Sequence, residues 1–270
     1  MARRLLLLRH GQTDYNATGR MQGQLDTPLS AQGREQARLA AKELAHWDIR
    51  LVIASDLSRA AQTADILAMA QGLTPSYDKR LRETHLGQWQ ARSHEEIDAA
   101  HPGQRSMWRH NPEWAPPEGE TRVEVATRAR AVVDDLMYSF PEWEGGCVLV
   151  VAHGGTIAAL TSSLLGLPID NYSAFSGLGN TSWAQLTARP RCHYDTTVAT
   201  AAGADVEVCA RNRAVDTVPV TDFSDTTVDD AQWYLDAWNA SALGVPYAPT
   251  QPGSAGVGNT YTRTSAEGFQ

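Results

Sequence analysis

The sequence predicts an α/β protein, a three-layer α/β/α sandwich in which helices flank a mostly parallel sheet. Two observations carry this prediction. Along residues 3–186, short apolar runs alternate with longer segments of helical periodicity, as is typical of strands buried on both faces and connected by helices. The chain has 270 residues, 42% of them hydrophobic, which is enough for one large core.

The first elements follow this alternation. Leu5–Leu8, four leucines between arginines, predicts a short buried strand. A helix is expected over 30–44, because serine is a favoured N-cap residue and the residues after Ser30 have helical spacing. A second strand over 51–54 and a second helix over 57–70 come next.

The longest helix is expected over 121–140. Thr121 and Glu124 have the spacing of a capping box, in which each side chain bonds the backbone N–H of the other residue. One face of this helix is expected to carry the apolar residues Val123, Ala126, Val133 and Leu136. A third, strongly apolar strand is expected over 148–152, followed by a helix over 156–165.

The composition of the chain changes after residue 186. Two more strands are expected, over 181–188 and 233–240. Between them, at about 189–231, a long segment rich in Thr, Asp, Ala and Val predicts a mobile excursion with at most a weak hairpin. Residues 244–270 are rich in Gly, Pro, Ser and Thr and predict a flexible or disordered tail.

Charge and cysteine content exclude some functions. The chain carries 23 Lys+Arg against 31 Asp+Glu, a net charge of −8, and after residue 186 acidic side chains outnumber basic ones two to one. Nucleic acid is not the expected partner, because binding to its phosphates needs a cluster of basic residues. No apolar run approaches the roughly 20 residues of a membrane span or the roughly 7 to 15 of a secretion signal. With three cysteines, an odd number, these features favour a cytoplasmic protein.

The cysteines differ in their expected roles. Cys147 lies in an apolar run and is expected in the core. Whether Cys192 and Cys209 pair stays open. None of the three has the spacing of a zinc site.

Charged residues follow each of three predicted strands. The first ends in Arg9-His10, the second is followed by Arg59 and the third by His153-Gly154. Because the carboxyl ends of parallel strands meet at one edge of a sheet, we expect these side chains to lie close together. Two arginines, two histidines and the start of a helix suit a dianion, of which phosphate is the natural example.

The segments that carry these residues resemble the histidine phosphatase superfamily, which has the phosphoglycerate mutase-like fold. The matching segments, in the order of the family over about residues 3–186, are LLLLRHGQTDYN, GRMQGQLDTPLSAQG, SDLSRAAQTA, LRETHLGQWQ, PEGET and VVAHGGTIAAL. The resemblance implies one histidine phosphatase domain over 1–243, with the excursion at about 189–231, followed by the tail.

The resemblance also implies roles for individual residues. His10, in the Arg-His-Gly motif, corresponds to the nucleophile that becomes phosphohistidine, and Glu83 to the general acid. The implied phosphate-binding residues are Arg9, Asn16, Gln22, Gly23, Arg59, His153 and Gly154. No cofactor and no metal ion is implied.

The physical chemistry of these residues fits such a role. A histidine must be neutral to attack phosphorus, and nearby Arg9 and Arg59 disfavour a proton on His10. The same cations would stabilise charge on the phosphoryl oxygens, which is the main demand of phosphoryl transfer.

Hydrolase and mutase differ in what happens to the phosphohistidine, and the sequence favours the hydrolase. In the family, mutases carry a longer and more basic insertion than the segment 88–120 of this chain, in which the fixed cations are Arg92, Arg105 and Arg109. The alternatives are a phosphoglycerate mutase and a broad-specificity small-molecule phosphatase. A sensor without activity is expected to lack His10 or Glu83, and both are present.

Further segments resemble one actinobacterial group of these phosphatases, which acts on a phosphorylated and glucosylated sugar acid. They include RHGQTDYN, RMQGQLDT, GLGNTSWAQL and LDAWNAS. The resemblance implies a small phosphorylated substrate and a homodimer. The segment from about 187 to 232 and the tail after Leu243 are expected to be departures from that group.

Two weaker signals have alternative interpretations. Residues 94–101, HEEIDAAH, contain several potential metal ligands but lack the spacing of a zinc motif, so a solvated helix face is favoured. Trp108 and Trp114 either line a pocket over the catalytic histidine or pack in the core.

Overall fold

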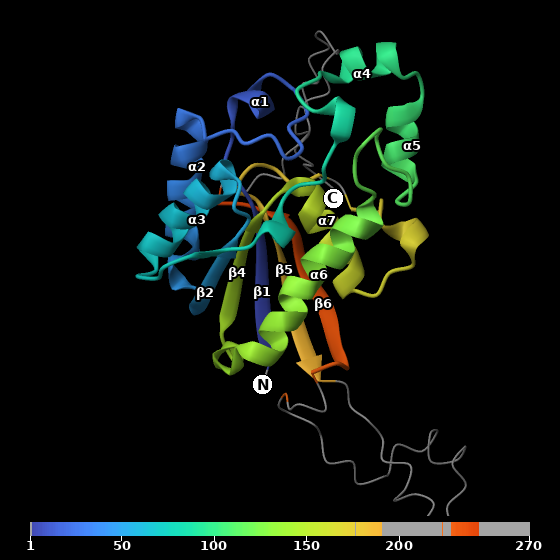
Figure 1. Cartoon of the computed structure of the whole chain (residues 1–270). Coiled ribbons are helices and arrows are strands. Elements are labelled where there is room, and N and C mark those ends of the chain that lie inside the picture. The colour runs from blue at the N-terminus through green and yellow to red at the C-terminus, as the bar shows by residue number, and fades with distance from the viewer. Residues whose placement is uncertain (1, 176, 191–222, 224–227, 243–270) are drawn as a thin grey trace, which may run out of the picture.

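The structure is a computed structural model that describes residues 2–175, 177–190, 223 and 228–242 (Figure 1). Within these residues, six strands form one mixed sheet in the order β3-β2-β4-β1-β5-β6. The strands are β1 (Arg3–Arg9), β2 (Ile49–Ala54), β3 (Ser76–Tyr77), β4 (Cys147–Ala152), β5 (Trp183–Pro190) and β6 (Ala231–Ala240). The first four are parallel, whereas β5 pairs antiparallel with both β1 and β6. The predicted fold class is therefore confirmed.

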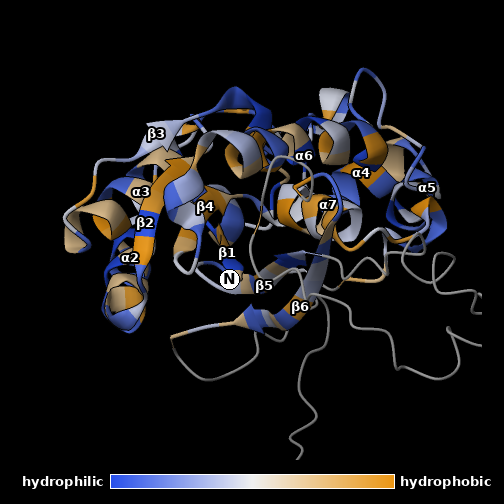
Figure 2. Cartoon of the chain, turned by 90° about the horizontal axis from the view of Figure 1, so that it is seen from below, coloured by the Kyte–Doolittle hydropathy of each residue, from blue (hydrophilic) through white to orange (hydrophobic). Residues whose placement is uncertain are grey.

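Helices cover both faces of the sheet. The α-helices are α1 (Asp14–Ala17), α2 (Ala31–Glu43), α3 (Ser58–Ala70), α4 (His94–Ala100), α5 (Gln104–His110), α6 (Arg122–Ser139) and α7 (Gly154–Leu164). Short 3-10 helices lie at Leu44–His46, Lys79–Leu81, Gly87–Trp89, Pro141–Trp143 and Ile169–Asn171. Viewed along the strands, α6 and α7 lie on one side of the sheet and α2 on the other (Figure 2).

The core consists of two apolar layers separated by the sheet. Successive side chains of a strand point to opposite faces, so Leu5 and Leu7 pack with α6 and α7, while Leu6 and Leu8 pack with α2 and α3. All four leucines are fully buried. A run of leucines without polar alternation is therefore what this central strand requires.

Most predicted elements are confirmed, with small shifts at their ends. The two late strands predicted over 181–188 and 233–240 are β5 and β6. Ser30 caps α2 by accepting from the N–H of Gly33, and the capping box of Thr121 and Glu124 opens α6. The helix predicted from 156 begins two residues earlier, directly after His153.

The predicted apolar face of α6 is partly wrong. Val123 and Leu136 are only half-buried. The buried residues are Val125, Ala126, Ala129, Val132, Val133 and Met137. The first turns of α6 pack on α7 through Val125 and Ala126, and the later turns pack in the core on the sheet. The buried face is therefore the one that contains these residues, and Val123 and Leu136 lie at its edge.

The short helix α5 was not assigned from the sequence, whereas α4 lies within the segment 94–101 for which a solvated helix was favoured. On α4, the acidic residues Glu95, Glu96 and Asp98 are exposed and only Ile97 is buried, which agrees with a solvated helix. No group of potential metal ligands is found among the described residues. Beneath these helices, an indole cluster forms around the buried Trp89.

Some predictions fall outside the described residues. They are the tail over 244–270, most of the excursion at 189–231, and the pairing of Cys192 with Cys209. Cys147 is buried and unpaired, as expected for a core residue. Among the described helices, none has the length and apolar character needed to cross a membrane.

Candidate active site

Two histidines meet at the carboxyl ends of adjacent parallel strands. His10 follows β1 and His153 follows β4, and these two strands pair in register up to Arg9 and Ala152. The imidazole rings lie edge to face with their centroids 5.1 Å apart. The sheet register therefore brings together residues that are far apart in the sequence.

The ring of His10 is held in one orientation and one tautomer. Nδ1 lies 2.7 Å from the carbonyl oxygen of Gly11, and because a carbonyl can only accept, Nδ1 carries the proton. Nε2 accepts from Nε–H of Arg59 at 3.2 Å. Burial lowers the pKa of His10 well below its usual value, and the charges of Arg59 and Arg9 lower it further. His10 is therefore neutral at physiological pH, with its lone pair on Nε2.

Arg59 is a fully buried cation whose position is fixed by backbone oxygens. Besides His10, its guanidinium donates to the carbonyls of Leu25 and Gly23, each at 2.8 Å. Burial lowers the pKa of Arg59 to about 10, so it stays charged at neutral pH. Gly23 has a positive φ of +56°, and a Cβ there would collide with Gln90, so glycine is required at this turn.

His153 is completely buried and bonded to a serine. Its Nε2 lies 2.9 Å from the hydroxyl of Ser55, the residue that follows β2. Among the described residues, Nδ1 of His153 has no hydrogen-bond partner. Burial lowers the pKa of His153 well below its usual value, followed by the charge of Arg59. Ser55 was not singled out from the sequence.

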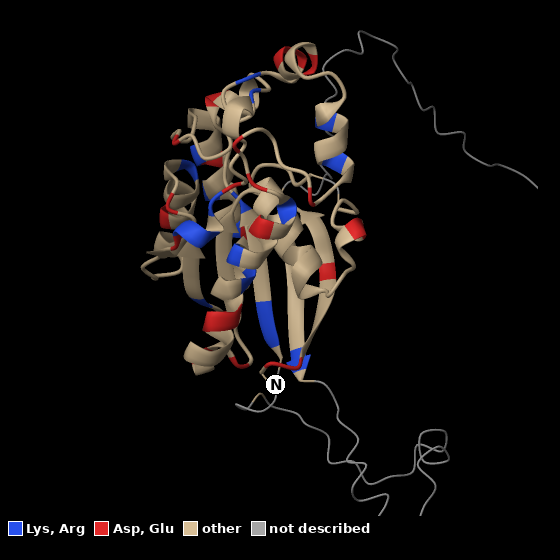
Figure 3. Ribbon diagram, turned by 45° about the vertical axis from the view of Figure 1, so that its right-hand side comes forward, with Lys and Arg blue, Asp and Glu red and all other residues tan. Residues whose placement is uncertain are grey.

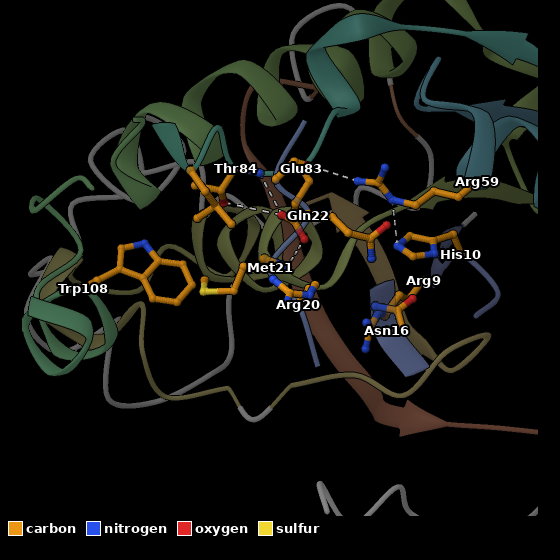
Figure 4. Close-up of a pocket in the computed structure, with 13 residues that line it drawn as sticks. Arg9, His10, Asn16, Arg20, Met21, Gln22, Arg59, Glu83, Thr84 and Trp108 are labelled. Carbon is orange, nitrogen blue, oxygen red and sulfur yellow. Dashed lines mark hydrogen bonds between the residues drawn. The ribbon is translucent and has the colours of Figure 1, made fainter. Parts of the chain in front are cut away.

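Arg9 and Asn16 lie on the side of His10 that is opposite to Arg59 (Figure 4). The guanidinium of Arg9 donates to the carbonyl of Leu178. The amide oxygen of Asn16 accepts from Thr13 N–H at 3.1 Å and from Asn180 Nδ2 at 3.3 Å, which leaves its NH₂ group on the cavity. Asn180, which also donates to the carbonyl of His10 at 3.0 Å, lies in the segment GLGNTSWAQL but was not singled out there as a site residue.

Glu83 is bound to the first turn of α7. Its carboxylate accepts from the backbone N–H groups of Gly155 and Thr156, both at 3.1 Å. This corrects one expectation. The start of α7 was predicted to donate its N–H groups to a phosphate, and in the structure two of them bond the carboxyl group of Glu83 instead.

The backbone of Glu83 is also held in place by hydrogen bonds from other segments. Its carbonyl accepts from Arg128 Nη2 and from Gln24 Nε2, each at 3.0 Å. Arg128 is held in turn by Glu120 through two bonds of 3.0 Å. This buttress was not predicted, because Gln24, Glu120 and Arg128 lie more than thirty residues from Glu83 in the sequence and meet it only in the folded chain.

These side chains surround one cavity of about 190 Å³. Of the residues predicted from the sequence, His10, Arg9, Asn16, Gln22, Gly23, Arg59 and Glu83 line it. His153 lies behind His10, and Gly154 lines an adjoining hollow instead.

Trp108 and Trp114 occupy different positions relative to the cavity. Trp108 lies at the end of the cavity opposite His10 (Figure 4) and also packs edge to face on Trp89, so both interpretations hold for it. Trp114 packs against Trp89 and is not part of the lining.

A neutral histidine with an unprotonated Nε2, fixed cations around it and a carboxylate across the cavity are the groups that phosphoryl transfer requires. Together with the mixed α/β sheet, they define an enzyme that acts on phosphate esters. The chain belongs to the histidine phosphatase superfamily, branch 1, whose family model matches residues 5–196. It is therefore a histidine phosphatase.

Individual relatives are similar over most of the chain. A glucosyl-3-phosphoglycerate phosphatase of Mycolicibacterium vanbaalenii is 47% identical over 244 residues, which cover 89% of this chain and 96% of the relative. The structure of a mycobacterial glucosyl-3-phosphoglycerate phosphatase complexed with VO3 is 45% identical, with a TM-score of 0.72 over 88% of this chain and all of that chain. A probable phosphoglycerate mutase of Serratia proteamaculans is 40% identical over 167 residues, covering 60% of this chain and 74% of the relative.

Proposed function

We propose that this chain hydrolyses glucosyl-3-phosphoglycerate to glucosylglycerate and phosphate through a phosphohistidine on His10. The observation that carries the proposal is the state of His10, which is neutral, protonated on Nδ1, and directs Nε2 at the cation Arg59 beside an open cavity. The glucosyl-3-phosphoglycerate phosphatases described above, which match nearly their whole length, support the choice of substrate.

In the first step, Nε2 of His10 attacks phosphorus. The N–P bond forms as the bond from phosphorus to the ester oxygen breaks, and Glu83 donates a proton to that oxygen so that it leaves as an alcohol. In the second step, Glu83 takes a proton from water, the water oxygen bonds to phosphorus, and the N–P bond breaks. Glu83 regains its proton and His10 its lone pair.

The groups around His10 serve the charge that develops on phosphorus. Arg9 and Arg59 bond the phosphoryl oxygens as cations, and His153 does so through Nδ1, which has no partner among the described residues. In this proposal Asn16 and Gln22 donate their side-chain amides, while Gly23 and Gly154 allow a close approach of the backbone. Fixed donors lower the barrier because they need no reorganisation during the reaction.

We further propose a homodimer that acts in the cytoplasm. The likeness to the actinobacterial phosphatases supports the dimer, and the free buried thiol of Cys147 suits a reducing compartment. Sedimentation at several protein concentrations tests the dimer, and a mass of one chain throughout would contradict it.

The second candidate is a phosphoglycerate mutase, which the likeness to the Serratia relative favours. A mutase must exclude water and return the phosphoryl group to the substrate. With 2,3-bisphosphoglycerate and 3-phosphoglycerate, a mutase would form 2-phosphoglycerate with little free phosphate. The proposed hydrolase releases phosphate instead.

A panel of phosphate monoesters tests the choice of substrate. Initial rates of phosphate release are compared for glucosyl-3-phosphoglycerate, 3-phosphoglycerate, sugar phosphates and an aryl phosphate, and the first is expected to give the highest kcat/KM. If it is hydrolysed no faster than the aryl phosphate, the chain is a broad-specificity phosphatase and the proposed substrate is wrong.

A further inference from the structure

A second hollow, of about 470 Å³, adjoins the His10 cavity. Thr84, Trp108 and Gly155 line both hollows, so the two lie next to each other, close to Glu83. One wall of the second hollow consists of α7 and the loop that follows it, including Tyr172. The opposite wall carries two arginines, Arg109 at the end of α5 and Arg122 at the start of α6.

These two arginines differ from Arg20 and Arg105, which lie on the same side of the molecule. Arg20 pairs with Glu96 at 3.1 Å and Arg105 pairs with Asp98 at 2.5 Å. Among the described residues, no acidic side chain forms an ion pair with Arg109 or Arg122. Figure 3 shows α5 with basic residues and no acidic ones, whereas α4 is acidic. The wall of the hollow therefore presents positive charge that no acidic side chain in the described part of the chain pairs with.

The partial burial of Arg122 makes its positive charge energetically unfavourable. Its guanidinium lies 5.3 Å from the centroid of the Trp108 ring, and the side chain is partly buried. Burial lowers the pKa of Arg122, the neighbouring charge of Arg109 lowers it further, and the charge of Glu83 opposes them. Arg122 is partly buried whereas Arg109 is exposed, and an anion between these two like charges would stabilise both.

The position of Glu83 in the first cavity indicates which part of the substrate reaches the second hollow. Glu83, the proposed proton donor to the leaving oxygen, is bonded to Gly155, which lies at the junction of the two hollows. With phosphorus at His10, the leaving oxygen faces Glu83, and the rest of the leaving group extends past Trp108 towards Arg109 and Arg122.

We propose that Arg109 and Arg122 form a carboxylate-binding subsite that recognises the acid group of the leaving glycerate. The inference rests on the proposed function and extends it, because it assigns the residues that select a phosphorylated acid over a phosphorylated alcohol. Guanidinium groups suit this task, since they bond a carboxylate through two parallel N–H groups.

Two substrates that differ only in this group provide the test. In 3-phosphoglycerate the carbon chain ends in a carboxylate, and in glycerol 3-phosphate it ends in a hydroxymethyl group. The kcat/KM ratio of acid to alcohol is measured for the intact chain, Arg109→Gln and Arg122→Gln. Arg92→Gln is the matched control, because it removes the same charge from the same side of the molecule but does not line either hollow.

The acid-to-alcohol ratio is expected to fall about 10- to 100-fold in each of the two variants, mainly through KM, as is typical for the loss of a charge-assisted bond. It should stay within about twofold in Arg92→Gln, where no such bond is lost. Arg122→Lys, which keeps the charge over Trp108, should retain part of the preference. Hydrolysis of glycerol 3-phosphate by each variant shows that its catalytic centre is folded.

Two results would overturn the inference. One is an acid-to-alcohol ratio near one in the intact chain, and the other is a ratio that both glutamine variants leave as it was. Failure of the proposed substrate is a separate result: glucosyl-3-phosphoglycerate would then be no better than 3-phosphoglycerate or an aryl phosphate, while the arginines still control the preference for acids.

Discussion

Arg59 donates its Nε–H to Nε2 of His10, the nitrogen that has to attack phosphorus. This contact aligns the ring and adds to the effect of burial in lowering the pKa of His10, but it also occupies the lone pair. An incoming phosphoryl oxygen can accept the same N–H and so free the lone pair at the moment of binding. The geometry thus links the binding of the dianion to the release of the nucleophile.

Replacing Arg59 by lysine tests this link. A lysine cannot bond His10 and the carbonyls of Leu25 and Gly23 together, because it lacks the planar fork of the guanidinium. We expect kcat/KM to fall about 100- to 1,000-fold. Arg50→Lys, at the opposite end of the sheet, is the control and should be near normal. A loss of less than about fivefold in Arg59→Lys would show that the contact is dispensable.

Ser55 is expected to act as a positioning residue for His153. By donating to Nε2, its hydroxyl would keep the proton of His153 on Nδ1, the nitrogen proposed to face phosphate. Ser55→Ala should lower kcat about 10-fold with a smaller change in KM, and Ser55→Thr should recover part of the loss. The control is Ser162→Ala, another buried serine, which bonds only a carbonyl of its own helix. Equal losses in both alanine variants would indicate a general packing effect.

Glu83→Gln separates the two proposed steps. Glutamine cannot protonate a leaving alkoxide, so the first step should slow about 100- to 1,000-fold for an alkyl phosphate. A dinitrophenyl leaving group needs no proton, so with that ester the variant should phosphorylate quickly and then stall as phosphoenzyme.

Rapid-quench kinetics measures the burst, with exposed Glu113→Gln as the control. If the variant slows both esters equally in the first step, Glu83 is not the general acid.

How far the sequence predicted the site depends on the kind of contact. His10, Arg59 and His153 were found because parallel strands bring their carboxyl ends to one edge, which is a rule of topology. Glu83 follows no strand, and only the family resemblance pointed to it. Ser55, Asn180 and the Arg128–Glu120 buttress were missed, since their roles depend on hydrogen bonds between distant segments.

The elements of the fold also differ in how well the sequence predicts them. Long periodic elements such as α2 and α6 were predicted close to their observed ends. The helix α5, which was missed, has seven residues, too few for a clear periodicity, and its Trp108 packs in the cluster around Trp89. The N–H groups at the start of α7 were misassigned because the sequence does not show that a carboxylate already occupies them.

The two buried histidines should make stability depend on pH. Their pKa values are lowered in the folded chain, so below the ordinary value of about 6.5 the unfolded chain binds more protons. The free energy of unfolding should therefore fall as pH drops from 7 towards 5, by about 1.4 kcal/mol per pH unit for each histidine. His94, whose pKa burial also lowers, adds a smaller part.

Urea unfolding at a series of pH values measures this slope. His10→Gln and His153→Gln should each remove about 1.4 kcal/mol per pH unit from it. The exposed His110→Gln is the control and should leave it as it is. Carboxyl groups with a lowered pKa, such as Asp78, change the stability only near or below pH 3.8, which is outside the range from pH 7 to 5. An unchanged slope in both buried variants would show that these histidines are protonated in the folded chain.

The most direct test of the account is to find the phosphoryl group on the enzyme. Turnover is stopped within milliseconds in alkali, where phosphohistidine is stable, and the modified residue is located by peptide mass spectrometry. The account predicts one phosphoryl group on Nε2 of His10, and neither this group nor phosphate release in His10→Ala. A phosphoryl group on another residue, or near-normal phosphate release by His10→Ala, would contradict it.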